Sequence, residues 1–290
     1  MTAEIPGILY RRAPAITPVP LVFDSPHSGT TYPDDFGHAV PLSILRKAED
    51  THVDALFEAA PDHGAMLVAA RFPRSYIDVN REAADIDPKL LAEPWPEEVP
   101  PGRPRPGEKS KLGVGLIRRL AQAGVPVYDR QLGVEEIRAR IETYYRPYHD
   151  ALAESIDDLH RRFGVVWHVN CHSMASRGSA ITPDGDAERA DFVLGDRDGT
   201  SCGPIFTDLV ARALGEMGYA VKINDPYKGA EIVRRYGDPF RRRHSLQIEI
   251  NRRLYMDEET REKNAGFDRL RADLSELISL VASYARAALA

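Results

Sequence analysis

Cysteine is scarce in this sequence, and long apolar runs are missing from it. The 290 residues include two cysteines, Cys171 and Cys202, which are too few for a disulfide framework in a chain of this length. No apolar run approaches the roughly twenty residues that a membrane span needs. The first residues also lack the basic and then apolar order of a signal peptide. We therefore expect a cytoplasmic protein with reduced thiols and no membrane partner.

A stripe of basic residues is lacking as well. The net charge is −6, whereas nucleic-acid binding relies on clustered Lys and Arg side chains. The densest basic stretch, residues 234–243, is interrupted by Gly237 and Pro239, so a pocket wall or a solvated face explains it more simply. We expect no nucleic-acid partner.

What the sequence does contain is the pattern of an α/β protein with a sizeable core, since 43% of its residues are hydrophobic and 28% are charged. Short apolar segments predict buried strands, and apolar residues at helical spacing predict helices between them. The predicted strands are 20–24, 65–70, 165–170, 219–223 and 246–250, and the predicted helices are 41–60, 134–163, 203–218 and 260–290. Pro147 is a site for a kink and Gly164 a helix end.

Strands that alternate with helices imply a mixed, largely parallel sheet covered on both faces, which is a three-layer α/β/α fold. We find no internal repeat and no domain boundary, so residues 1–290 are expected to form one domain. The proline-rich segment 94–106 interrupts the alternation, because six prolines exclude a helix or a central strand. An ordered surface loop is the simpler interpretation, and a lid or an arm to a neighbouring subunit is the alternative.

Polar residues gather where predicted strands end, which is where α/β folds place their ligand sites. His27 follows the first strand, and Ser173 follows His172 after the third. Glu249 lies inside the last apolar strand. In the segment SYIDVNR, polar residues alternate with apolar ones and include Asp78, Asn80 and Arg81. Each residue alone has a structural explanation, such as packing or an ion pair, but together they indicate a site.

This set of residue types suits a catalytic zinc ion, which takes three His or carboxylate ligands and keeps one position open. His168 and His172 cannot both bind one ion, because four strand residues span roughly 13 Å. We choose His172, which lies at the strand end, and expect His168 to be a packed or hydrogen-bonded residue of the sheet. An acidic ligand is expected from residues 49–54, where Asp50 and Asp54 are one helical turn apart. The spacing leaves both open.

Seven motifs in a fixed order resemble the N-formylglutamate amidohydrolase family. They are SPHSG, EDTHVDALF, SYIDVNR, NCHSM, VLGDRDGTSC, KGAEIVRRYG and LQIEINRRLYMDE, and they cover about residues 21–258. The resemblance implies a fold like that of the zinc carboxypeptidases (phosphorylase/hydrolase-like), with one catalytic zinc ion. The sequence departs from the carboxypeptidase pattern after His27, where the usual His-x-x-Glu spacing is absent.

The resemblance also assigns roles to residues of this chain. It implies His27, His172 and Asp50 as the metal ligands, with Asp54 as the alternative to Asp50. It implies Glu249 as the general base. Residues that bind the substrate would be Asn80, Arg81 and Ser173, and Arg234 would bind substrate or stabilise the oxyanion.

The implied reaction is zinc-dependent hydrolysis of the formyl amide of N-formyl-L-glutamate, a small-molecule carboxylate, to formate and the amino acid. Another divalent ion could replace zinc in such a site. One alternative is a related amidase or peptidase that acts on another N-acyl amino acid or a short peptide. Others are a metal-binding module without turnover and a carboxylate-binding domain without a metal.

Overall fold

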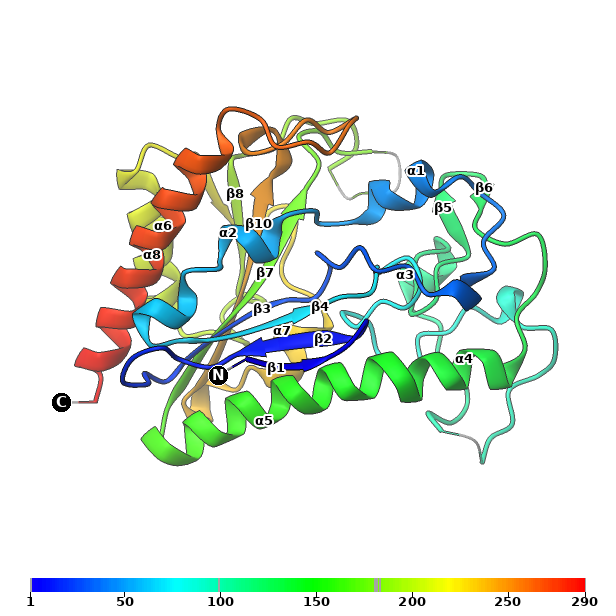
Figure 1. Ribbon diagram of the computed structural model, residues 1–290, viewed down its shortest axis with the longest axis horizontal. Coiled ribbons are helices and arrows are strands. Elements are labelled where there is room, and N and C mark those ends of the chain that lie inside the picture. The colour runs from blue at the N-terminus through cyan, green and yellow to red at the C-terminus, as the bar shows by residue number, and fades with distance from the viewer. Residues whose placement is uncertain (1, 99, 180–181, 183, 290) are drawn as a thin grey trace.

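The computed structural model describes residues 2–98, 100–179, 182 and 184–289, and a mixed eight-stranded sheet runs through them (Figure 1). The strand order is β1-β2-β4-β3-β7-β10-β8-β9. The four central strands, from β4 to β10, are parallel to one another, whereas β1, β2 and β8 run antiparallel to neighbours. The strands are β1 (Thr2–Ile5), β2 (Leu9–Arg12), β3 (Leu21–Ser25), β4 (Met66–Ala70), β7 (Val166–Met174), β8 (Phe192–Gly195), β9 (Val221–Ile223) and β10 (Arg243–Asn251).

Helices cover both faces of this sheet, as Figure 1 shows. One face packs against α2 (Val53–Leu56), α6 (Pro204–Glu216) and α8 (Phe267–Ala287). The other packs against α4 (Val134–Arg140), α5 (Arg146–Phe163) and α7 (Glu231–Tyr236). Alternate residues of β3 point to opposite cores: Leu21 and Phe23 to the first, Val22 to the second. The predicted largely parallel, three-layer α/β/α fold is confirmed.

The predicted central strands are present, and two of them are longer than expected. Strands β7 and β10 pair in parallel over nine residues, from Val166 opposite Arg243 to Met174 opposite Asn251. His172 therefore lies inside β7 rather than after it. Strands β1, β2 and β8 were not predicted, because each has only four residues and too little alternation to stand out.

The predicted helix 41–60 is wrong as a continuous element. The chain forms α1 (Leu42–Leu45), a 3₁₀ turn at Arg46–Ala48 and then α2. Between them His52 has a left-handed backbone with φ of 68°, which an α-helix does not tolerate in its interior. This break turns Asp50 out of any helix and gives it a direction different from that of Asp54.

The predicted helix 134–163 is present with one irregularity. A π-helical stretch at Ile141–Tyr145 joins α4 to α5 and ends two residues before Pro147. Proline lacks an N–H and crowds the preceding turn, which accounts for the local widening. Gly164 ends the helix in the left-handed region with φ of 70°, as expected.

The segment 94–106 has no helix or strand in its described residues, which exclude residue 99. It leads into α3 (Glu108–Lys111) and a small hairpin of β5 (Leu120–Gln122) and β6 (Val125–Pro126). We call residues 107–127 the α3–β6 segment. Within the described part of the chain, no helix is both long and apolar enough to cross a membrane.

Candidate active site

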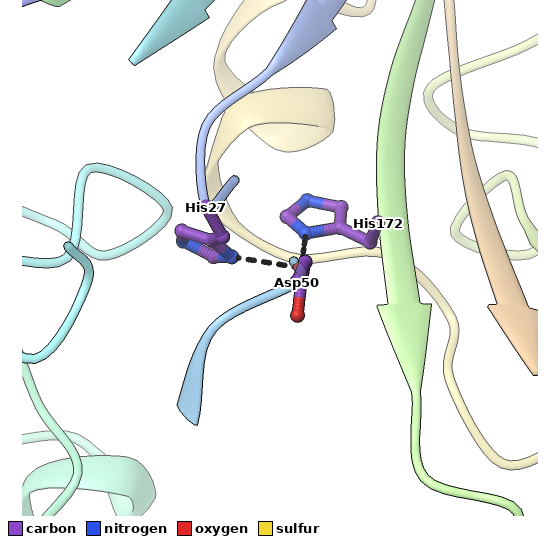
Figure 2. A group of neighbouring side chains, drawn as sticks. All are labelled: His27, Asp50 and His172. Atoms are coloured by element: carbon purple, nitrogen blue, oxygen red, sulfur yellow. Dashed lines mark hydrogen bonds and ion pairs between the residues drawn. The ribbon is translucent and has the colours of Figure 1, made fainter. Parts of the chain in front are cut away.

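Two histidines and one aspartate lie close together at the carboxyl ends of the central strands, as Figure 2 shows. His27 lies in the loop after β3, His172 in β7 and Asp50 in the bend before α2. One potential ligand atom from each lies within 4.8 Å of the others. The Oδ2 atom of Asp50 is 2.9 Å from Nδ1 of His172 and 3.4 Å from Nδ1 of His27. All three side chains are buried.

The topology explains why these residues meet. Strands β3 and β7 are parallel neighbours with Asp24 opposite Asn170. The two histidines therefore lie side by side at the carboxyl ends of these strands. The backbone N–H of Asp50 donates to the carbonyl oxygen of His27 at 3.0 Å. Asp54 lies elsewhere, with its carboxylate accepting from the hydroxyl of Tyr10 at 3.1 Å. Of the two acidic alternatives, the structure brings Asp50 to the histidines.

A close backbone approach fixes the loop after His27. A Cβ atom on Gly29 would lie 2.3 Å from the carbonyl carbon of Arg71, so this position accepts only glycine without a backbone shift. The glycine of the SPHSG motif therefore holds the His27 loop against the chain that leaves β4 and carries Arg74 and Asp78.

The far nitrogen of each histidine has its own acceptor. Nε2 of His27 lies 2.7 Å from Oδ1 of Asp78, and Nε2 of His172 lies 2.7 Å from Oδ1 of Asn170. Asn170 in turn donates to Asp24, which His168 also contacts at 2.8 Å. With Nε2 as donor, both Nδ1 lone pairs face Asp50. Such outer contacts orient metal-binding imidazoles, and His168 is a hydrogen-bonded residue of the sheet as expected.

We call His27, Asp50 and His172 the ligand group, and their side chains fit a divalent metal ion. Nδ1 of His27 is buried without a hydrogen-bond partner, which is rare for a buried polar atom unless a ligand completes its surroundings. Two imidazole nitrogens and one carboxylate are the ligand set that zinc takes in open catalytic sites. The residues present therefore suit the metal that the sequence predicts.

The carboxylates beside the histidines are held in their ionised form. Burial alone would raise the pKa of Asp50, but contacts with His172, His27 and Arg74 outweigh it and hold the pKa well below its usual range. Burial likewise opposes ionisation of Asp78, whose pKa is lowered chiefly by Arg74. Arg74 donates to Oδ2 of Asp78 at 2.8 Å and 3.2 Å.

The ligand group opens onto a cavity of about 770 Å³, which Glu249 also lines. Glu249 is opposite His172 in the pairing of β10 with β7, and it accepts a hydrogen bond from Gln247 at 2.9 Å. Burial raises the pKa of Glu249 above its usual value, an effect that His172 opposes and Asp50 reinforces. A carboxylate with a raised pKa beside a metal site is suited to taking up a proton.

The predicted substrate-binding residues all line this cavity. The Arg81 guanidinium is oriented by two carbonyl oxygens, that of Asn80 at 2.8 Å and that of Val114 at 3.3 Å. Oδ1 of Asn80 accepts from the N–H of Ile232, and its Nδ2 lies 3.1 Å from Nε2 of His172. Ser173 accepts a hydrogen bond from Arg252 at 3.1 Å.

Comparison with known proteins agrees with this architecture. The model of the N-formylglutamate amidohydrolase family matches residues 19–256. The crystal structure of N-formylglutamate amidohydrolase from Ralstonia eutropha JMP134 is 50% identical, covers 97% of this chain and 99% of its own, and superposes with a TM-score of 0.91. This chain belongs to the N-formylglutamate amidohydrolase family.

Two relatives and one further structure are less similar to this chain. N-formylglutamate deformylase of Pseudomonas putida is 31% identical over 248 residues, which are 83% of each chain. That of Pseudomonas aeruginosa is 30% identical over 266 residues, covering 89% of this chain and 88% of its own. The gene product Atu2144 of Agrobacterium tumefaciens, at 19% identity and a TM-score of 0.64 over 97% of this chain and 95% of its own, shares the fold.

One residue to which the family resemblance assigned a role, Arg234, does not line the cavity. Arg234 is half-exposed on α7 and forms ion pairs with Glu231 at 2.7 Å and Glu82 at 2.8 Å. It is not among the described residues that line the cavity. The i, i+3 pair with Glu231 keeps its guanidinium on the outer face of the helix.

Sequence reasoning missed most of the positive charge around the cavity. Eight Lys and Arg side chains line it, compared with one carboxylate among the described lining residues, that of Glu249. They are Lys47, Arg74, Arg81, Lys109, Arg118, Arg189, Lys228 and Arg252. Most of these cations lie in loops or short helical turns with no periodic pattern. Arg81, Lys228 and Arg252 lie within the seven motifs, but only Arg81 was assigned a role.

Proposed function

We propose that this protein is a zinc-dependent deformylase that hydrolyses the formyl amide of N-formyl-L-glutamate to formate and glutamate. The observation that carries this proposal is the position of Glu249, beside two histidines and an aspartate arranged as metal ligands, in a cavity whose other charged lining residues are cations. The names of the relatives support the substrate. The donor set supports zinc.

His27, Asp50 and His172 would hold the metal ion. When bound, a zinc ion supplies a Lewis acid that lowers the pKa of water to near neutral and polarises a carbonyl group. Asp78 and Asn170 keep the two imidazole rings turned so that their Nδ1 atoms face Asp50.

Glu249 would act as the general base and then as the general acid. It takes a proton from the water that attacks the formyl carbon, and it returns that proton to the amide nitrogen as the C–N bond breaks. Its raised pKa makes it a stronger acceptor than an ordinary glutamate. The hydrogen bond from Gln247 fixes its carboxylate.

Cations would hold the substrate and offset developing charge. Beyond its two carbonyl contacts, Arg81 has Nη2 4.0 Å from Oδ2 of Asp78, which is too far for a hydrogen bond, and it would bind a substrate carboxylate. Because Arg234 does not line the cavity, Arg74 or Arg252 would offset charge on the carbonyl oxygen. Both lie against the ligand group, with Nη1 of Arg74 3.9 Å and Nη2 of Arg252 3.0 Å from Oδ1 of Asp50.

A substrate panel tests the proposal against its alternatives. Zinc-loaded protein is incubated with N-formyl-L-glutamate, N-acetyl-L-glutamate and a dipeptide, and the released formate or amino acid is measured. We expect formate from the formyl substrate and much slower release from the others. Preference for the acetyl substrate or the dipeptide would favour a related amidase or peptidase. Zinc binding without any hydrolysis would favour a metal-binding module, and His172→Ala with full activity would exclude this site.

A further inference from the structure

The α3–β6 segment forms a wall of the cavity and directs three side chains with hydrogen-bond donors toward it: Lys109, Arg118 and Gln122. Lys109 belongs to α3, Arg118 lies before the hairpin and Gln122 ends β5. The segment is tied to the substrate-binding residues through Val114, whose carbonyl oxygen accepts from Nε of Arg81 at 3.3 Å. A substrate carboxylate on Arg81 therefore lies next to this wall.

The donors of this wall are unpartnered. The side chains of Lys109 and Arg118 make no hydrogen bond or ion pair with any residue that the structure describes. Nε of Arg118 and Nε2 of Gln122 are fully buried and lack a partner. Five other lining cations lie within 4.0 Å of a carboxylate: Arg74 and Arg81 of Asp78, Arg189 of Asp184, Lys228 of Asp198, and Arg252 of Asp50.

Uncompensated positive charge therefore collects at this wall. Burial, and then the nearby guanidinium of Arg74, lower the pKa of Arg118 to about 9, so it stays charged at neutral pH. Burial and the neighbouring Arg81 also lower the pKa of Lys109. Buried donors and charges without partners destabilise a protein unless a ligand satisfies them. An anion bound between Lys109 and Arg118 would satisfy both cations and the amide of Gln122.

We propose that Lys109, Arg118 and Gln122 form a second carboxylate subsite, which binds the side-chain carboxylate of the substrate while Arg81 binds the other. This inference rests on the proposed deformylase function and deepens it. It names the residues that would distinguish a dicarboxylic N-formyl amino acid from one with a neutral side chain. The subsite discriminates against neutral side chains of the same shape, because a neutral amide would leave the two cations unpaired.

The test compares N-formyl-L-glutamate with its neutral isostere, N-formyl-L-glutamine, by kcat/KM for formate release. We expect the wild type to prefer the glutamate compound by about 10²-fold, the scale of hydrogen bonds between charged groups. In Arg118→Gln this ratio should fall toward 1, and in Lys109→Gln it should fall about tenfold. Arg118→Lys, which keeps the charge, should recover most of the preference.

The matched control is Lys111→Gln, which removes an exposed cation of the same helix that pairs with Glu108 outside the cavity. It should keep the wild-type ratio, and thermal unfolding should show that all variants are folded. The subsite is excluded if the wild type hydrolyses both compounds equally well, or if Arg118→Gln slows both by the same factor. If the wild type releases no formate from any N-formyl amino acid, the proposed function fails and the subsite fails with it.

Discussion

The two walls of the cavity are built on opposite principles. On the wall formed by the sheet edge, polar side chains are engaged with one another: His27 with Asp78, His172 with Asn170, and Asp50 with Arg252 at 3.0 Å. On the wall formed by the α3–β6 segment, Lys109 and Arg118 have no partner among the described residues.

This difference separates two requirements of a catalytic site. Groups that perform chemistry need a fixed geometry, and hydrogen bonds within the protein provide it. Groups that recognise a substrate need donors that are still free when the substrate arrives. The sheet wall is therefore expected to tolerate little change, whereas the α3–β6 wall should tolerate substitutions at the cost of selectivity. The following predictions are ordered from the largest expected effect to the smallest.

The largest effect is expected at the acidic ligand. Asp50→Asn should weaken zinc binding by roughly 10²-fold or more, because even residues that only orient metal ligands contribute 10- to 100-fold. Formate release should fall with it. Asp54→Asn is the matched control, since Asp54 contacts Tyr10 rather than the histidines. Zinc per chain after dialysis, measured by elemental analysis, checks this. Equal zinc in both variants would remove Asp50 from the ligand set.

Glu249→Gln separates chemistry from metal binding on the same wall. We expect kcat to fall by about 10² to 10⁴, the usual contribution of a general base, with zinc content unchanged. Glu259→Gln, an exposed glutamate that does not line the cavity, serves as the control. Steady-state rates of formate release measure the effect. A decrease of less than about tenfold would assign the proton transfer to another group.

Arg81 and Arg234 distinguish a cavity cation from an outer one. Arg81→Gln should raise KM for N-formyl-L-glutamate by roughly 10- to 100-fold, because it removes a charged contact to a carboxylate. Arg234→Gln breaks only half-exposed ion pairs and should change kcat/KM by no more than about twofold. A large loss of kcat in Arg234→Gln would return that residue to the catalytic machinery.

The smallest effect concerns stability behind the sheet wall. His149 is buried, and its Nε2 lies 2.9 Å from the carbonyl oxygen of Val79, next to Asn80. Burial, followed by Arg235, lowers its pKa to about 3. The unfolded chain, with a histidine pKa of about 6.5, binds the extra proton first as the pH falls. Between about pH 6 and pH 4 the free energy of unfolding should therefore fall, because of this histidine, by up to roughly 1.4 kcal/mol for each unit that the pH decreases.

Urea unfolding of wild type and His149→Gln across that pH range checks this prediction. The difference between the two proteins isolates this site from carboxylates that titrate in both. The variant should lose stability more slowly as the pH falls. Parallel curves for the two proteins would mean that His149 is already protonated in the folded state or contributes no linkage.

The sheet wall could be predicted from the sequence because it follows from topology. Parallel strands end at one edge, so His27, His172 and Glu249 could be expected to converge. The spacing of Asp50 and Asp54 could not decide between them, and the choice of Asp50 came from the family resemblance, because the structural reason is the left-handed turn at His52 and a hydrogen bond to His27. Helical spacing gave no sign of either feature.

The cation-lined wall was out of reach for a different reason. Lys109 and Arg118 lie in a short helix and an irregular stretch, where no period in the sequence tells which side chains point inward. Arg234 was expected at the site because its motif resembles that of the family, whereas the structure pairs it with Glu231 on the same helix face and leaves it out of the cavity lining. The sequence therefore predicts which residues lie at strand ends, but it does not predict in which direction the side chains of loop residues point.

The most direct test of the central claim is formate release from N-formyl-L-glutamate by chelator-treated wild-type protein, measured before and after zinc is added back. We expect the metal-free protein to be inactive, about one zinc ion per chain to restore activity, and the same addition to leave Asp50→Asn inactive. Undiminished formate release by the metal-free protein would contradict a zinc-dependent reaction.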